Sequence, residues 1–312
     1  MAKFVFCLMG PTASYKTHLA CELSTVFPLE IISVDSAMIY QGMDIGTAKP
    51  SALLLERFPH HLVDIINPTE TYSAAQFCDD VHLLIKDSWS RGKWPFLVGG
   101  TMMYFNALQQ GLSSLPEADI EIRKQLLAQA EEQGWAALHA ELTQIDPFAA
   151  SRIHTNDTQR IQRALEVYRI TGRSLTELCQ SPKEHSLYTF VNLILFPEQR
   201  DKLHRRIEQR FKQMLDDNLI AEVISLLQTW PLALDAVSLR SVGYRQVVEY
   251  LRGDYGQTAL YEKGAAATRQ LAKRQLTWLR HWPQNAMRFD IENFDNTQAA
   301  LISTLLRLAE TQ

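Results

Sequence analysis

The stretch that decides the fold is Gly10-Pro11-Thr12-Ala13-Ser14-Tyr15-Lys16-Thr17. An apolar run at residues 4–9 precedes it, and apolar side chains at helical spacing follow it over residues 18–23. A strand, a turn and a helix in this order predict a phosphate-binding loop of the pattern G-x-x-x-x-G-K-[ST]. In such a loop, backbone N–H groups face the phosphates, Lys16 adds positive charge and Thr17 can bind Mg²⁺. Tyr15 departs from the pattern, because it stands where the second glycine is expected.

The composition is that of a folded globular protein. Of the 312 residues, 46% are hydrophobic and 21% are charged, which suffices for one large core or two modest ones. The apolar run near the start is too short for a signal peptide or a membrane span. Cys7, Cys21, Cys78 and Cys179 form neither a C-x-x-C pair nor a metal-ligand spacing. We therefore expect a reduced, cytoplasmic protein with no membrane partner.

Apolar runs alternate with helical patterns along most of the chain. The runs predict strands at residues 30–35, 60–66, 95–98, 188–196 and 288–290. Helices are predicted over residues 73–89, with Ser73 as N-cap, and from Met102 onward. This alternation predicts an α/β fold, a parallel sheet of the P-loop NTPase type flanked by helices, with its functional groups at the carboxyl ends of the strands.

Between residues 116 and 186 the strands disappear from the pattern. Charged, alanine-rich helical segments take their place at residues 119–133, 135–144 and 157–171. We therefore expect a core formed by residues 1–115 and 187–312, interrupted by an all-helical insertion domain at 116–186. In the second half of this core, long helical stretches are predicted at residues 199–229, 258–281 and 296–310.

Two further segments follow buried strands of the same predicted sheet. They are Asp35-Ser36 and Gly99-Gly100-Thr101. A strand-ending Asp can simply cap a turn, and a glycine pair can simply be a tight turn. Because the carboxyl ends of parallel strands share one edge, both segments should nevertheless lie beside the phosphate loop. This predicts a carboxylate and a hydroxyl grouped around one phosphate site.

The charge is distributed unevenly. Residues 1–150 carry 9 Lys and Arg against 17 Asp and Glu, whereas residues 151–312 carry 22 against 18. Eight of these cations fall within residues 240–280, together with Tyr244 and Trp278. Cations for phosphates and flat rings for unstacked bases are typical of single-stranded RNA recognition. The alternatives are solvated helix faces for the cations and core packing for Trp278.

The motifs resemble those of the tRNA dimethylallyltransferase family. The similarity lies in seven blocks in the family's order, at residues 10–17, 32–40, 42–50, 97–104, 206–210, 241–246 and 267–275. The resemblance implies transfer of a dimethylallyl group from dimethylallyl diphosphate to the N6 amine of the adenosine on the 3′ side of a tRNA anticodon. Diphosphate is released, Mg²⁺ is required, and the tRNAs are those that read codons beginning with U.

The resemblance also implies roles for individual residues. Asp35 matches the general base, and Thr101 a hydroxyl that orients the amine or a diphosphate oxygen. Lys16, Thr17 with Mg²⁺, and Arg210 would neutralise the departing diphosphate.

Contact with the anticodon stem-loop is implied for a larger set, and the insertion is expected to clamp that stem-loop. The set is Asp35, Ser36, Ala37, Met38, Thr101, Arg123, Gln159, Arg160, Ile161, Gln162, Arg163, Arg240, Ser241, Val242, Gly243, Tyr244, Arg245, Lys273, Arg274, Gln275, Leu276, Thr277, Trp278, Leu279 and Arg280. The protein is expected to act as a monomer.

Two other functions fit the same sequence. The fold class and the loop also suit a kinase acting on a small molecule or nucleotide, and Tyr15 suits a relative that binds tRNA without turnover. A loop of this type needs glycine before its Lys where φ is positive, and a bulky residue there costs about 1–2 kcal/mol. From the sequence alone we expect that strain at Tyr15 leaves the fold intact but impairs catalysis. Tyr15→Gly would then raise activity.

Overall fold

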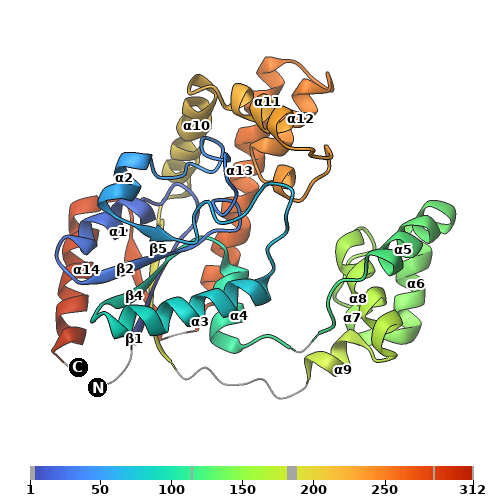
Figure 1. Ribbon diagram of the computed structural model, residues 1–312, viewed down its shortest axis with the longest axis horizontal. Coiled ribbons are helices and arrows are strands. Elements are labelled where there is room, and N and C mark those ends of the chain that lie inside the picture. Colours follow the sequence, from blue (N-terminus) through green and yellow to red (C-terminus); the bar gives the residue numbers. More distant parts are fainter. Residues whose placement is uncertain (1–3, 114, 181–187, 284, 311–312) are drawn as a thin grey trace. The chain divides into compact units, whose positions relative to one another are not determined.

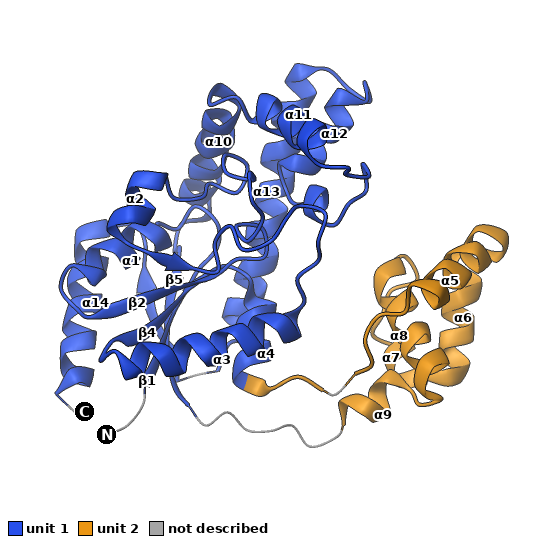
Figure 2. Cartoon of the chain, in the orientation of Figure 1, with its two compact units in different colours: residues 1–109, 186–312 blue, residues 110–185 orange. Residues whose placement is uncertain are grey.

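The protein, represented by a computed structural model, is described for residues 4–113, 115–180, 188–283 and 285–310. The chain forms two compact units, residues 1–109 with 186–312 and residues 110–185 (Figure 2). The boundary predicted at residues 186 and 187 lies outside the described residues. Within the described parts, no helix combines the length and apolar character needed to cross a membrane.

The larger unit is built on one sheet, in which all neighbouring strands are parallel. In spatial order, the described strands are β3 His60–His61, β2 Leu29–Val34, β4 Trp94–Gly99, β1 Phe4–Met9, β5 Thr189–Phe196 and β6 Met287–Asp290 (Figure 1). The predicted α/β class with a parallel sheet is confirmed.

One predicted strand is much shorter than expected. The run at residues 60–66 forms a strand only at His60 and His61. Leu62 and Asp64 have φ of 61° and 55°, and this left-handed backbone cannot continue an extended strand. The prediction of a strand through residue 66 was therefore wrong.

Helices cover both faces of the sheet. α1 Lys16–Ser24 and α14 Phe294–Ala309 pack on one face, α3 Ala74–Ser90 and α4 Met102–Gln110 on the other (Figure 1). Because successive side chains of a strand point to opposite faces, β1 serves both layers. Val5, Cys7 and Met9 pack with the α3 and α4 layer, and Phe6 and Leu8 with the α1 and α14 layer. Ser73 is the N-cap of α3, as predicted, and its side chain and that of Gln76 form a capping box.

The register of the sheet brings three strand ends to one level. Gly99 at the end of β4 pairs with Met9 of β1 and with Val34 of β2. A Cβ at Gly99 would lie 2.0 Å from the carbonyl oxygen of Val34, so only glycine permits this approach. The phosphate loop, Asp35 and Gly100 therefore begin at the same edge of the sheet.

A layer of helices continues beyond this edge. It consists of α10 Arg200–Asp216, α11 Leu219–Thr229, the 3-10 turn η1 Ser238–Arg240, α12 Tyr244–Leu251 and α13 Gln257–Arg280, while the short α2 Ala52–Arg57 lies elsewhere in the unit. The stretch predicted as helical over residues 199–229 is two helices, because Asn218 takes φ 71° between them. α10 and α13 are close neighbours, since a Cβ at Gly264 would lie 1.9 Å from the Phe211 ring.

The smaller unit is entirely helical where it is described. Its helices are α5 Ile120–Gln133, α6 Trp135–Ile145, α7 Pro147–Ala150, α8 Thr158–Thr171 and α9 Leu175–Cys179 (Figure 2). It has its own apolar core, which includes Leu126, Leu138 and Leu165. The helices predicted at 119–133, 135–144 and 157–171 are confirmed, and α7 and α9 are additional short helices.

Candidate active site

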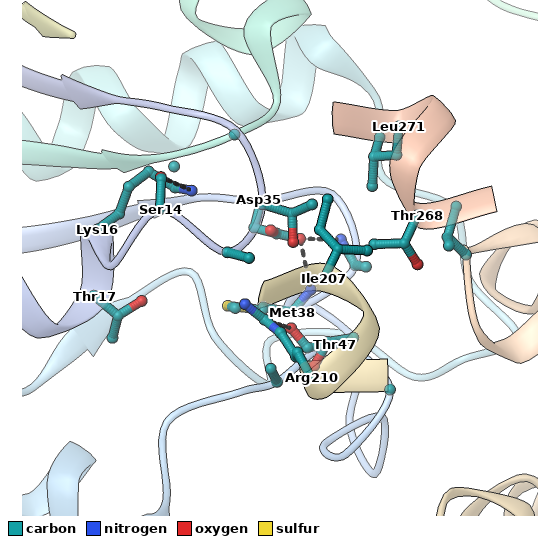
Figure 3. A pocket seen from close by; sticks show the side chains of 18 of the residues that line it. Ser14, Lys16, Thr17, Asp35, Met38, Thr47, Ile207, Arg210, Thr268 and Leu271 are labelled. Atoms are coloured by element: carbon teal, nitrogen blue, oxygen red, sulfur yellow. Dashed lines mark hydrogen bonds between the residues drawn. The ribbon is translucent and has the colours of Figure 1, made fainter. Parts of the chain in front are cut away.

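A cavity of about 480 Å³ opens at the edge where the strands end. Its lining comes from the phosphate loop, the end of β2, the loop at residues 46–50, α10 and α13 (Figure 3). Lys16, Asp35 and Arg210 all line it. Two segments predicted to lie beside the phosphate loop, at Asp35 and at Gly99-Gly100, thus share one cavity with it.

The phosphate loop has the strained backbone that the sequence predicted. Tyr15 has φ 60° and ψ 16° and immediately precedes α1, and Ala13 also has a positive φ of 59°. The Ser14 hydroxyl, which is buried, donates to the carbonyl oxygen of Pro11 over 2.7 Å and closes the turn. A left-handed residue other than glycine costs about 1–2 kcal/mol, so other contacts must hold Tyr15 in place.

Lys16 is poised to respond to an anion. Its Nζ donates to the carbonyl oxygen of Pro11 over 2.6 Å and to Ser14 Oγ over 3.3 Å. Burial and, to a smaller extent, the positive charge of Arg210 lower the pKa of Lys16 to about 7, although Asp35 opposes the shift. A bound anion would supply the missing negative charge and restore the protonated form.

Asp35 is held by the turn that follows β2. Its Oδ1 accepts hydrogen bonds from the backbone N–H groups of Ala37 and Met38, over 2.9 and 3.2 Å. Asp35 therefore does cap a turn, as the plain structural interpretation suggested. The cap uses one oxygen only, and among the described residues Oδ2 has no hydrogen-bond partner. The carboxylate lies in the cavity with one oxygen able to accept a proton (Figure 3).

Thr101 lies beside this turn. Its Oγ1 accepts a hydrogen bond from the backbone N–H of Ser36 over 3.1 Å, and its own N–H donates to Val34 over 3.2 Å. Asp35, Gly99 and Gly100 line the cavity, whereas Ser36 and Thr101 are not among its lining residues. The hydroxyl and the carboxylate thus come from adjacent strand ends.

Arg210 reaches the cavity from α10. Its Nη2 donates to the carbonyl oxygen of Thr47 over 3.3 Å. Burial lowers the pKa of Arg210, and the negative charge of Asp35 opposes that shift. A guanidinium stays charged even so, because its ordinary pKa lies far above neutral pH. The cavity therefore contains a permanent cation in addition to Lys16.

Gln275 is a structural link that the sequence analysis did not identify. Its Oε1 accepts a hydrogen bond from the N–H of Thr12, and its Nε2 donates to the carbonyl oxygen of Gly100, both over 2.9 Å. One side chain of α13 thereby joins the phosphate loop to the turn after β4. The sequence placed Gln275 among the tRNA contacts, but it is buried at 9% exposure.

Glu222 on α11 likewise holds a distant segment, the loop at residues 42–50, through hydrogen bonds to its backbone. Its carboxylate accepts hydrogen bonds from the backbone N–H groups of Asp44, Ile45 and Gly46, over 3.1, 2.7 and 3.2 Å. The hydroxyl of Tyr244 donates to the same carboxylate over 2.5 Å. Glu222 was also missed by the sequence analysis, because no local pattern indicates a bond between elements so distant in the chain.

Several residues expected to contact tRNA are buried inside the protein. Tyr244, Ile161, Leu276 and Leu279 are at most 5% exposed. Tyr244 packs in the core around α11 and α12, and Ile161 packs in the core of the smaller unit. These four side chains serve helix packing and are not exposed, so their expected contact with RNA stays a prediction. Gly243 is buried as well.

Two arginines of the smaller unit have a structural partner. Arg123 and Arg163 both pair over 2.7 Å with Glu166, whose side chain is fully buried. Arg163 also donates to the carbonyl oxygen of Pro116 over 2.7 Å. An unpaired buried carboxylate is costly, so these arginines stabilise the unit whether or not they meet RNA.

The remaining expected tRNA contacts stay predictions. Ser36, Gln159, Arg160, Arg240, Arg245, Lys273, Arg274, Thr277, Trp278 and Arg280 are exposed. Ala37, Met38, Gln162, Ser241 and Val242 are partly exposed. Trp278 is 44% exposed, so core packing does not account for it.

A phosphate loop beside a carboxylate and a buried guanidinium, at the edge of a parallel sheet, defines an α/β protein of the P-loop type that binds anionic substrates. Residues 38–282 match the model of the IPP transferase family. The chain belongs to this family.

Proteins named tRNA dimethylallyltransferase are similar over nearly the whole chain. The one from Legionella pneumophila strain Corby is 60% identical, covering 94% of this chain and 93% of that protein. The one from Thiobacillus denitrificans is 53% identical, covering 96% of each. The crystal structure of the full-length tRNA isopentenylpyrophosphate transferase from Bacillus halodurans has a TM-score of 0.72 at 36% identity, covering 99% of this chain and 97% of that one.

The lowered pKa of Lys16 predicts proton uptake when inorganic diphosphate binds. Above pH 7 much of the free protein has neutral Lys16, and a bound anion raises the pKa of Lys16 again. At pH 8 we expect uptake of up to about one proton per site, and affinity that falls as pH rises. Titration calorimetry at pH 8 in two buffers of different ionisation enthalpy measures the uptake.

The matched control is Lys16→Arg, whose charge does not titrate in this range. This variant removes the proton uptake by Lys16 and keeps any protonation change of diphosphate itself. Equal proton uptake by the two proteins would contradict the assigned pKa shift.

Proposed function

We propose that this protein transfers the dimethylallyl group of dimethylallyl diphosphate to the N6 amine of the adenosine 3′ of the anticodon, in tRNAs that read codons beginning with U. The observation that carries the proposal is the grouping of Asp35, Lys16 and Arg210 in one cavity at the phosphate loop. Membership of the IPP transferase family supports it. Acting on tRNA, the protein would work in the cytoplasm, as a monomer.

The cavity offers the donor two subsites, one that can bind an anion and one that is apolar. The N–H groups of the loop, with Lys16 and Arg210, suit a diphosphate. Ile207 of α10 and Leu271 of α13 line the same cavity and offer apolar surface to a five-carbon chain (Figure 3). A donor that joins a diphosphate to a short prenyl group has these two properties.

Mg²⁺ fits this arrangement only together with the diphosphate. In the described parts of the chain, no group of three or more His, Cys, Asp or Glu could hold a metal ion. The Thr17 hydroxyl lines the cavity and is the oxygen ligand that the loop offers. Mg²⁺ bound to Thr17 and to diphosphate oxygens would neutralise negative charge on the leaving group.

Asp35 would act as the general base that makes a weakly nucleophilic amine reactive. The lone pair of the exocyclic amine is delocalised into the adenine ring, so the amine is a weak nucleophile. As nitrogen bonds to C1 of the dimethylallyl group, the C1–O bond breaks and its electrons leave with diphosphate. Asp35 accepts the proton from nitrogen, while Lys16 and Arg210 stabilise the departing charge. The target base must leave its stack to reach this carboxylate.

The main alternative function is that of a kinase, because the loop alone would also serve phosphoryl transfer from ATP. The second alternative is a relative that binds tRNA without turnover. One experiment separates the three: the protein is incubated with labelled dimethylallyl diphosphate and unmodified tRNA, and in parallel with labelled ATP. Prenylated tRNA supports the proposal, phosphoryl transfer supports a kinase, and tRNA binding without product supports the third.

Asp35→Asn tests the role of the carboxylate. Asparagine keeps the acceptor for the turn but cannot take a proton, so we expect single-turnover prenyl transfer to fall by about 10²–10⁴-fold. tRNA affinity should remain within a few-fold of that of the wild type. Asp216→Asn, which changes an exposed carboxylate at the end of α10, is the matched control. A fully active Asp35→Asn protein would exclude Asp35 as the base.

The exposed cations are the candidate RNA contacts. Arg160 is 71% exposed at its side chain and forms a long ion pair with Asp157, over 3.4 Å. Arg274 is exposed on α13, next to the buried Gln275. If each contacts a phosphate, Arg160→Ala and Arg274→Ala should each weaken tRNA binding and reduce the slope of log K against log salt by about 1. Filter binding at several salt concentrations measures both.

Arg307→Ala is the control for these variants, because Arg307 is an exposed arginine on α14. Arg163→Ala is a less clean variant, since it also removes a partner of buried Glu166. Unchanged salt slopes for Arg160→Ala and Arg274→Ala would remove both residues from the RNA contact.

A further inference from the structure

Tyr15 and Arg206 make contact at the wall of the cavity. The Arg206 guanidinium carbon lies 5.3 Å from the centre of the Tyr15 ring, in cation–π geometry. The ring of Phe294 meets Tyr15 edge-on at 6.1 Å between centres. Both Tyr15 and Arg206 line the same cavity as Lys16 and Arg210. The residue that replaces the expected glycine therefore contacts both an arginine and an aromatic ring, while its side chain stays 46% exposed.

Arg206 has hydrogen-bonding capacity that the protein leaves unused. Its side chain is 16% exposed, and its Nε and Nη2 are buried without a hydrogen-bond partner among the described residues. A guanidinium has five N–H donors, and a buried donor without an acceptor is unfavourable. A ligand with several oxygen acceptors would remove this deficit.

The nearest carboxylate does not satisfy Arg206. Glu292 Oε2 lies 3.8 Å from Arg206 Nη1 and 3.4 Å from Lys202 Nζ, so two cations share one distant oxygen. The contact is an ion pair without a short hydrogen bond. The other contact of the guanidinium at the cavity wall is the face of the Tyr15 ring.

We propose that Arg206 is a further cation of the diphosphate site and that the Tyr15 ring is the platform that aims it. The inference rests on the proposed function for the identity of the ligand. Oxygens of a diphosphate bound at the loop would accept from Nε and Nη2 of Arg206. Tyr15 is a positioning residue, because it acts through Arg206.

If Tyr15 positions Arg206, Tyr15→Gly should have the opposite effect to the rise in activity that the sequence predicted. The strain of a left-handed tyrosine is confirmed, but the ring supports a cation that glycine could not support. Tyr15→Gly relieves the strain and also removes the platform. We therefore expect this substitution to weaken diphosphate binding, not to raise activity.

The test measures binding of inorganic diphosphate with Mg²⁺ by titration calorimetry, on the full chain. Tyr15→Phe keeps the ring, Tyr15→Leu keeps the backbone strain and removes the ring, and Tyr15→Gly removes both. We expect affinity within about twofold of the wild type for Phe, and about 3- to 30-fold weaker for Leu and Gly. Arg206→Gln should weaken binding by about 10-fold or more, and Arg206→Lys by less.

Coupling between the two residues gives the readout that a merely structural role would not produce. In the Arg206→Gln background, Tyr15→Leu should cost no more than about twofold, because the ring then has no cation to aim. Equal losses in both backgrounds, unchanged affinity for Arg206→Gln, or tighter binding by Tyr15→Gly would each overturn the inference.

The binding experiment is independent of turnover. Coupled losses of diphosphate affinity in a protein that transfers no prenyl group would support the anion site and contradict the proposed reaction. Active transfer with no coupling would support the reaction and contradict the role of Tyr15.

Discussion

The site depends on the hydrogen bonds of one amide, that of Gln275. Gln275 accepts from the N–H of Thr12 and donates to the carbonyl oxygen of Gly100, and so joins α13 to two loops that follow different strands. A Cβ at Gly100 would lie 2.5 Å from Gln275 Nε2, so the glycine makes room for this side chain. Without the amide, the partly buried N–H of Thr12 would lack a partner, at up to about 1–3 kcal/mol, while the carbonyl oxygen of Gly100 would keep only its hydrogen bond from the N–H of Met102. The geometry of the phosphate loop is thus set by a residue far away in the sequence.

The cavity beside Gln275 contains buried positive charges whose burial is unfavourable in the absence of a ligand. Burial disfavours the charged forms of both Lys16 and Arg210, and each also repels the other. The left-handed Tyr15 adds backbone strain, which a cation–π contact of about 0.5–2 kcal/mol with Arg206 offsets. Such a site favours an anion strongly, since one diphosphate satisfies several groups at once. Stabilising a departing diphosphate requires the same property.

Much of this arrangement could be predicted from the sequence, because it is encoded locally. The carboxyl ends of buried parallel strands fall at one edge of a sheet, so the sequence alone places Asp35 and Gly99-Gly100 beside the loop. Contacts between distant elements have no such signal, which is why Gln275 and Glu222 were missed. Assigning RNA contact to whole segments also ignored helix faces: on α13, Lys273 and Trp278 are exposed while Leu276 and Leu279 are buried. The strand expected through residue 66 failed because two left-handed residues interrupt it.

The most direct test of the account is the affinity for inorganic diphosphate of a Gln275→Leu protein. Leucine has a similar size but leaves the N–H of Thr12 unpaired and breaks the link to the carbonyl oxygen of Gly100, so we expect affinity at least about 10-fold weaker. Leu279→Ala, one turn further along α13, removes core packing at a residue that does not line the cavity. It should lower the free energy of unfolding and leave diphosphate affinity unchanged. If Gln275→Leu binds diphosphate as tightly as the wild type, the amide does not organise the site and the account is wrong.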